Sequence, residues 1–204
     1  MRYEEGDDGP ESSIHVAREE YMIILIGGES HTGKTWLAQR LLEKYHYPYM
    51  SLDHLKMGLI RSNFPCNFTA LDDNTYIAEQ LRGIIKGIVD TCLENRQNLI
   101  IEGCYLPPHK VRELLHPEII ELYLIFSEVY IRNNFELVLN NENLTEQRKH
   151  SEELTEDFLV TENAMLKMAC IAAKTKYFEI QTDYITEIKS VFDYIHERKN
   201  NDMA

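Results

Sequence analysis

Apolar residues occur along this chain in two patterns, short continuous runs and longer stretches with a helical repeat. The runs Tyr21 to Ile26 and Ile119 to Phe126 are nearly uninterrupted, as in parallel strands that are covered on both faces. Shorter apolar runs predict three more strands, at Tyr47 to Leu52, Asn98 to Ile101 and Tyr177 to Gln181.

Helical patterns separate the predicted strands. The strongest is Asn74 to Arg96, where apolar residues from Ile77 to Cys92 form one stripe. Other helices are predicted at Lys34 to Tyr45, near His54, from Pro107 to Leu115, after an N-cap at Ser127, from Leu154 to Met168 and from Ile185 to Ile195. Because strands and helices alternate, the predicted class is α/β: a three-layer sandwich whose mainly parallel five-stranded sheet has helices on both faces.

The length of 204 residues fits one compact domain, which we expect to span residues 20–204. Residues 1–19 carry few apolar side chains, so burying them would not offset the entropy of ordering them, and we expect a flexible tail. The net charge of −13 makes nucleic acid an unfavourable partner, because a protein surface that binds nucleic acid needs basic residues.

Two further observations bear on the cellular compartment in which the protein is expected. No apolar run approaches the roughly 20 residues that span a bilayer, and no secretory signal is recognisable, so no membrane partner is expected. The four cysteines are irregularly spaced and form no zinc-ligand pattern, which indicates reduced thiols: Cys66, Cys92, Cys104 and Cys170. Together these features favour a cytoplasmic protein.

A phosphate-binding loop follows the first predicted strand and opens the first predicted helix. It matches the Walker A pattern GxxxxGK[ST] at every fixed position and consists of Gly28, Glu29, Ser30, His31, Thr32, Gly33, Lys34 and Thr35. The strand–loop–helix context is the one that this motif requires. The sequence therefore predicts a P-loop NTPase fold.

The motif predicts how a nucleotide is bound. Gly28 and Gly33 let backbone N–H groups point at the phosphates, and the start of the next helix adds positive potential. Lys34 is expected to bridge the β- and γ-phosphates of ATP, and the Thr35 hydroxyl is expected to bind Mg²⁺. His31 occupies a variable position of the motif, and we expect it to have no catalytic role.

The sequence lacks the motifs of several other classes of P-loop protein. No glycine is preceded three residues earlier by an aspartate, and no NKxD sequence occurs, which argues against a GTPase. An LSGGQ stretch, expected of transporter ATPases, is also absent. The remaining pattern resembles the P-loop kinases of small metabolites and nucleotides, a family that includes chloramphenicol phosphotransferase, zeta toxins, and 2-phosphoglycerate and shikimate-type kinases.

The resemblance implies roles for two acidic residues. In Tyr49 to Lys56, similar to the family's second strand and the following helix, Asp53 is expected to face the acceptor hydroxyl and act as base. An N-cap role for Asp53 is the alternative. Glu102 ends the third predicted strand, where relatives often carry an aspartate near Mg²⁺, and a structural salt bridge is its alternative.

The resemblance also implies a lid over ATP within residues 127–155. Arg132 and Arg148, with Lys149, are the candidate cations that close over the phosphates, because a guanidinium binds phosphate oxygens in pairs. An acceptor site is expected within residues 53–82, where Arg61 and Arg82 are candidates to hold an anionic group of the substrate. Surface salt bridges are the alternative for all of these side chains.

These expectations describe a kinase that transfers the γ-phosphate of ATP, with Mg²⁺, to a small molecule, using Lys34, Asp53 and Arg132 as catalytic residues. Three other functions stay open. One is a toxin-like or nucleotide-directed kinase with the same loop, and another is a regulator that binds ATP with little catalysis. A polynucleotide kinase is the third, and the acidic composition disfavours it.

Overall fold

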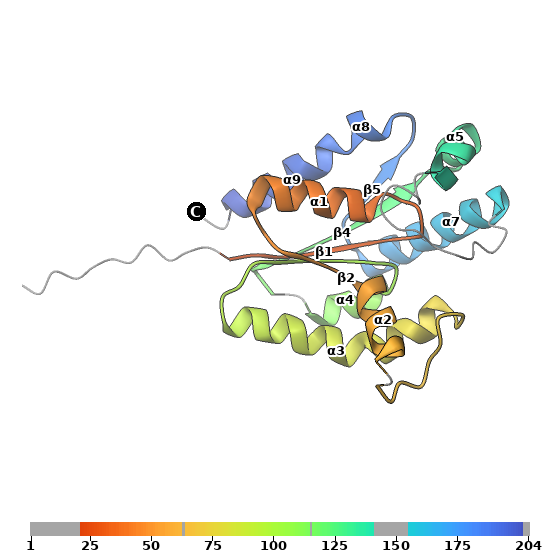
Figure 1. Cartoon of the computed structure of the whole chain (residues 1–204). Coiled ribbons are helices and arrows are strands. Elements are labelled where there is room, and N and C mark those ends of the chain that lie inside the picture. The colour runs from red at the N-terminus through yellow and green to blue at the C-terminus, as the bar shows by residue number, and fades with distance from the viewer. Residues whose placement is uncertain (1–20, 63, 115, 141–154, 202–204) are drawn as a thin grey trace, which may run out of the picture.

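The computed structural model describes residues 21–62, 64–114, 116–140 and 155–201. Its centre is a five-stranded sheet in which every neighbouring pair is parallel, in the order β2-β3-β1-β4-β5 (Figure 1). The strands are β1 (Ile23–Gly28), β2 (Tyr49–Ser51), β3 (Leu99–Glu102), β4 (Ile119–Phe126) and β5 (Tyr177–Ile180). Because the strands are parallel, the residues that follow β1, β2, β3 and β4 meet at one edge of the sheet.

Helices cover both faces of the sheet (Figure 1). They are α1 (Lys34–Tyr45), α2 (Leu52–Arg61), α3 (Asn74–Glu94), α4 (Pro108–Val111) with the 3₁₀ turn η1 (Arg112–Leu114), α5 (Glu128–Asn140), α7 (Glu156–Ala173), α8 (Tyr184–Glu187) and α9 (Lys189–Asn201). The predicted three-layer α/β sandwich is thus confirmed.

The two faces of β1 bury different sets of side chains. Ile24 and Ile26 pack with Leu37 and Leu41 of α1 and with residues of α9. Ile23 and Leu25 pack on the opposite face, against the apolar stripe of α3. Successive side chains of a strand point to opposite faces, so a strand that is apolar throughout requires helices on both sides.

Several element boundaries differ from those that the apolar pattern predicts. Helix α2 begins at Leu52, directly after β2, so the second strand is shorter than expected. The predicted helix before His116 is a single α-turn followed by the 3₁₀ turn η1. The closing helix is divided at Ile188 into α8 and α9. The predicted N-cap is confirmed, because the Ser127 hydroxyl accepts a hydrogen bond from the Tyr130 amide at 3.1 Å.

Some predictions fall outside the described residues. These are the tail over residues 1–19 and, in the predicted lid, residues 141–154 with Arg148 and Lys149. Within the described part of the chain, no helix is long and apolar enough to cross a membrane.

The interface between α3 and the sheet yields a stability prediction. Leu81 is completely buried there, so Leu81→Ala should lower the free energy of unfolding by about 2–5 kcal/mol through lost burial and a residual cavity. Leu71 is 86% exposed, and Leu71→Ala is the matched control, with an expected change within about 0.5 kcal/mol. Urea denaturation of both variants measures the difference. Equal effects would contradict this assignment of the core.

Candidate active site at the carboxyl end of the sheet

The P-loop, Gly28 to Thr35, forms the connection between β1 and α1, and two of its positions accept only glycine. Gly28 has φ +152°, and a Cβ there would lie 2.7 Å from the carbonyl oxygen of Leu124. Gly33 has φ +80°, and a Cβ there would lie 2.4 Å from the hydroxyl oxygen of Tyr184. The fixed glycines of the motif are therefore required by the local backbone and its neighbours.

The side chain of Lys34 is buried in the loop. Its Nζ donates a hydrogen bond to the backbone carbonyl of Glu29 at 2.6 Å, and the Thr32 hydroxyl donates to the same oxygen at 2.8 Å. The loop thus closes around the ammonium group, next to the backbone N–H groups that the motif predicts as phosphate ligands.

Acidic groups from three segments surround Lys34. Burial opposes the charge of the ammonium, but the nearby acidic side chains, among them Glu102, Asp53 and Glu29, outweigh it and raise the pKa of Lys34 above its usual value. Lys34 is therefore a charged group in a partly desolvated site. This is the condition under which a cation binds phosphate oxygens strongly.

Thr35 and Glu102 supply two oxygen atoms beside the loop. The Thr35 hydroxyl donates a hydrogen bond to Oε1 of Glu102 at 3.2 Å, and Glu102 is the buried last residue of β3. Burial, joined by the charge of Asp53, raises the pKa of Glu102, while Lys34 opposes this. A hydroxyl and a carboxylate beside a phosphate site fit Mg²⁺, which takes few protein ligands and several phosphate or water oxygens.

The described residues form no second candidate metal site. No group of three or more His, Cys, Asp or Glu side chains in that part of the chain has an arrangement that could hold a metal ion.

Asp53 lies in the first turn of α2 and faces the same cluster. The N-cap residue of this helix is Ser51, so the alternative prediction of Asp53 as the N-cap is wrong. Asp53 Oδ1 accepts hydrogen bonds from Lys56 Nζ at 3.0 Å and from the Tyr105 hydroxyl at 3.1 Å. Lys56 Nζ also donates to the Tyr105 hydroxyl at 2.5 Å.

Lys56, Tyr105 and Cys104 were not predicted as site residues. Lys56 follows Asp53 by one helical turn, a spacing that brings two side chains onto one helix face and is visible in the sequence. Tyr105 and Cys104 follow Glu102 closely, in the loop after β3. Cys104 Sγ lies 3.8 Å from the Ser30 hydroxyl, and burial raises the pKa of its thiol.

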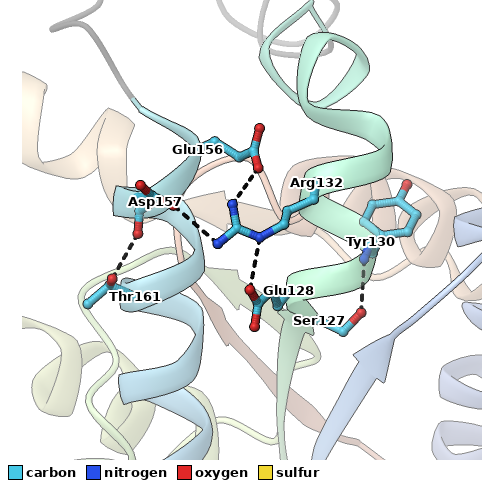
Figure 2. Close-up of polar contacts among 7 residues, drawn as sticks. All are labelled: Ser127, Glu128, Tyr130, Arg132, Glu156, Asp157 and Thr161. Atoms are coloured by element: carbon cyan, nitrogen blue, oxygen red, sulfur yellow. Dashed lines mark hydrogen bonds and ion pairs between the residues drawn. The ribbon is translucent and has the colours of Figure 1, made fainter.

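Arg132 has a different environment from that of the P-loop side chains. Figure 2 shows its guanidinium between three carboxylates, with Nε 2.8 Å from Glu128, Nη1 2.7 Å from Glu156 and Nη2 3.1 Å from Asp157. These hydrogen bonds raise the pKa of Arg132, and they join α5 to α7. The predicted role of Arg132 as a phosphate ligand requires it to leave these partners, and it stays a prediction.

The two predicted substrate arginines lie on exposed helix surfaces. Arg61 is in the last turn of α2. Arg82 forms ion pairs with Glu113 at 2.6 Å and Glu79 at 3.4 Å. Lys56, by contrast, donates a hydrogen bond to Asp53 at 3.0 Å.

Aromatic residues complete the outer side of the P-loop. The Tyr184 hydroxyl donates a hydrogen bond to the Gly33 carbonyl oxygen at 3.0 Å. Its ring makes edge contacts with Trp36 at 5.5 Å and with Phe126 at 6.1 Å between ring centroids. These contacts attach the β5–α8 connection to the start of α1, and they were not visible in the apolar pattern.

Comparison of the sequence with protein-family models and with curated proteins gives no match. Solved structures do match the fold. A gluconokinase from Sinorhizobium meliloti 1021 has a TM-score of 0.53 at 14% identity, covering 88% of this chain and 94% of that one. The YorR protein of Bacillus subtilis, solved with phosphorylated GDP, has a TM-score of 0.54 at 12% identity, covering 88% and 98%.

A third similar structure is shikimate kinase from Aquifex aeolicus vf5, with a TM-score of 0.50 at 13% identity, covering 86% of this chain and 96% of that one. Each alignment spans most of both chains. The chain therefore shares the fold of these structures, in agreement with the α/β class that the sequence predicts.

The carboxyl group of Glu29 gives a pH-dependent prediction. Burial, with a smaller contribution from Glu162 of α7, raises the pKa of Glu29 from 4.5 to about 7. The folded protein then holds this proton more tightly than the unfolded chain, so the contribution of Glu29 to stability falls as the pH rises from about 4.5 to 7.

Glu29→Gln removes this titration. Relative to wild type, the variant should gain about 1–3 kcal/mol in free energy of unfolding between pH 5 and pH 7.5. Urea denaturation at both pH values measures the gain, and Glu94→Gln, at an exposed position of α3, is the control. A difference between Glu29→Gln and wild type that does not change with pH would contradict the raised pKa.

Proposed function

We propose that this protein is an ATP-dependent kinase that phosphorylates a hydroxyl group of a small molecule. The observation that carries the proposal is the convergence of three chain segments at one edge of the sheet: the P-loop with Lys34, the end of β3 with Glu102, and the start of α2 with Asp53. A charged lysine beside a carboxylate that can take a proton is the arrangement that phosphoryl transfer to a hydroxyl needs.

The P-loop binds the triphosphate. Its backbone N–H groups and the start of α1 hold the β- and γ-phosphates, and the Lys34 ammonium exchanges the Glu29 carbonyl for phosphate oxygens. This exchange follows from charge, because a phosphate oxygen is a stronger partner for an ammonium than a neutral carbonyl. Lys34 then remains with the γ-phosphoryl group as negative charge develops during transfer.

Asp53 serves as the base. The acceptor hydroxyl lies against its carboxylate, and the proton moves to Asp53 while the acceptor oxygen bonds to the γ-phosphorus. The bond between that phosphorus and the oxygen that bridges to the β-phosphate breaks, and ADP leaves. Tyr105 and Lys56 hold Oδ1 of Asp53 in place by hydrogen bonds, so the orientation of the base is fixed before the acceptor binds.

Thr35 and Glu102 would hold Mg²⁺, which neutralises phosphate charge when it is bound. The buried position of Glu102 keeps its carboxylate at a fixed place relative to Thr35. Arg132 is a proposed second cation for the phosphates, conditional on release from its three carboxylates.

The similar solved structures support this proposal at the level of fold. The gluconokinase and the shikimate kinase are named for hydroxylated small molecules, and the YorR structure contains phosphorylated GDP. The last of these favours a second candidate, a kinase whose acceptor is a nucleotide. An acceptor panel that includes nucleoside monophosphates separates the two.

Two substitutions test the proposed mechanism. Lys34→Ala should lower kcat/KM for ATP by about 10²-fold or more, because one positioned donor to the transferred group is lost. Asp53→Asn should lower kcat by about 10²- to 10⁴-fold with little change in the KM for ATP, because the base is lost while the nucleotide site is intact. Coupled ADP-release assays over a panel of hydroxylated metabolites, antibiotics and nucleoside monophosphates measure both.

Lys86→Ala and Asp90→Asn are the matched controls for these variants. Lys86 and Asp90 form an exposed ion pair on α3, and their replacement should leave turnover unchanged. Nucleotide binding by the wild type without turnover on any acceptor would instead favour an ATP-binding regulator.

A further inference from the structure

Lys56 has a buried ammonium group next to Asp53. In the proposed mechanism this ammonium only holds the Asp53 carboxylate in place. The side chain of Lys56 is 11% exposed, whereas that of Lys86 on helix α3 is 58% exposed. Lys56 lies one turn after Asp53 on α2, and both side chains meet Tyr105 from the loop after β3. It is therefore a cation inside the site, beside the candidate base.

A buried charge is costly unless its hydrogen-bonding capacity is used. An ammonium group has three N–H donors. The hydrogen bonds described for Lys56 take two of them, one to Asp53 at 3.0 Å and one to the Tyr105 hydroxyl at 2.5 Å. The same two hydrogen bonds hold the ammonium in position. Among the described residues no third acceptor contacts this ammonium, so its remaining N–H can reach a ligand bound against Asp53.

The charges around this position determine which ligand suits it. A molecule that enters beside Asp53 also approaches Glu102, whose environment includes the charge of Asp53. A bound triphosphate would add further negative charge. A neutral acceptor needs no cation here, whereas an anionic acceptor would be repelled unless a positive group contacted its charge directly. Lys56 is positioned for that contact.

The short distance between base and cation limits the shape of the acceptor. Asp53 Oδ1 and Lys56 Nζ are 3.0 Å apart. An acceptor hydroxyl on the carboxylate and an anionic oxygen on the ammonium would each lie within hydrogen-bond reach, so these two oxygens would be separated by roughly 3–6 Å. That separation corresponds to a hydroxyl group and an acidic group on the same carbon or on nearby carbons.

We propose that Lys56 and Tyr105 form an anion subsite of the acceptor site, and that the acceptor is a small hydroxylated compound with a carboxylate or phosphate group close to the hydroxyl that is phosphorylated. This inference rests on the proposed kinase function. It replaces the exposed Arg61 and Arg82 with a buried lysine as the residue that recognises the acceptor's charge.

Calorimetric binding measurements test the subsite without requiring turnover. With ADP and Mg²⁺ present, gluconate is compared with glucitol, and glycerol 3-phosphate with glycerol, so that each anion has a neutral partner with similar hydroxyl groups. At least one anion should bind the wild type 10-fold or more tightly than its neutral partner. The gluconate arm reports a carboxylate preference and the glycerol 3-phosphate arm a phosphate preference.

Four variants assign that preference to the subsite. Lys56→Met should remove it, Lys56→Arg should restore part of it, and Tyr105→Phe should weaken anion binding several-fold. Lys86→Met and Tyr76→Phe change an exposed lysine and an exposed tyrosine on α3 and should retain wild-type binding. Thermal melting of each variant verifies folding, and the Lys56→Arg result keeps the test valid if Lys56→Met unfolds.

Three results would overturn the subsite: no anion binding by the wild type, equal binding of the neutral partners, or anion binding that Lys56→Met and Lys56→Arg leave unchanged. Phosphate transfer is followed separately, with the same proteins and acceptors and with ATP in place of ADP. Anion binding that depends on Lys56 without any transfer would contradict the kinase function alone. Transfer to a neutral acceptor that Lys56→Met does not affect would contradict the subsite alone.

Discussion

The arrangement at the carboxyl edge of the sheet depends on one buried ammonium group, that of Lys34. Taking this charge out of water is unfavourable, and the surrounding structure compensates for it with the Glu29 carbonyl and with acidic side chains from other segments. The compact loop that encloses Lys34 in turn requires glycine at positions 28 and 33. Charge compensation and loop shape are therefore parts of a single constraint.

The parallel sheet brings acidic side chains close to Lys34, because the carboxyl ends of its strands lie together at one edge. Residues that follow β1, β2 and β3 are neighbours at one edge, since these strands are adjacent in the order β2-β3-β1. The same order puts Asp53 and Glu102 within electrostatic reach of each other and of Lys34. Core packing of α1 and α3 on opposite faces holds the sheet, and with it the strand ends that carry the polar cluster.

The sequence was informative where a short local pattern has one structural solution. The P-loop has fixed glycines at a strand-to-helix turn, and Asp53 and Glu102 come at or just after strand ends, so their convergence could be predicted. Continuous apolar runs likewise identified the strands, because a strand covered on both faces cannot alternate.

Contacts between distant segments could not be read in this way. Tyr105 meets Lys56 across 49 positions, and Arg132 meets Glu156 across 24. In the sequence alone, each of these side chains could equally lie exposed at the surface, so nothing near it in the chain indicates its partner. Only the folded arrangement distinguishes Lys56, which it buries beside the base, from Arg82, which it pairs with exposed carboxylates.

We propose above all that this site transfers the γ-phosphoryl group of ATP to a hydroxyl. Phosphorus-31 NMR of the wild-type protein with ATP, Mg²⁺ and an acceptor panel tests it directly, because the method identifies the product that contains the transferred phosphorus. We expect a new phosphate monoester signal with one acceptor, growing in step with ADP. Unchanged ATP, or release of inorganic phosphate alone with every acceptor, would contradict it.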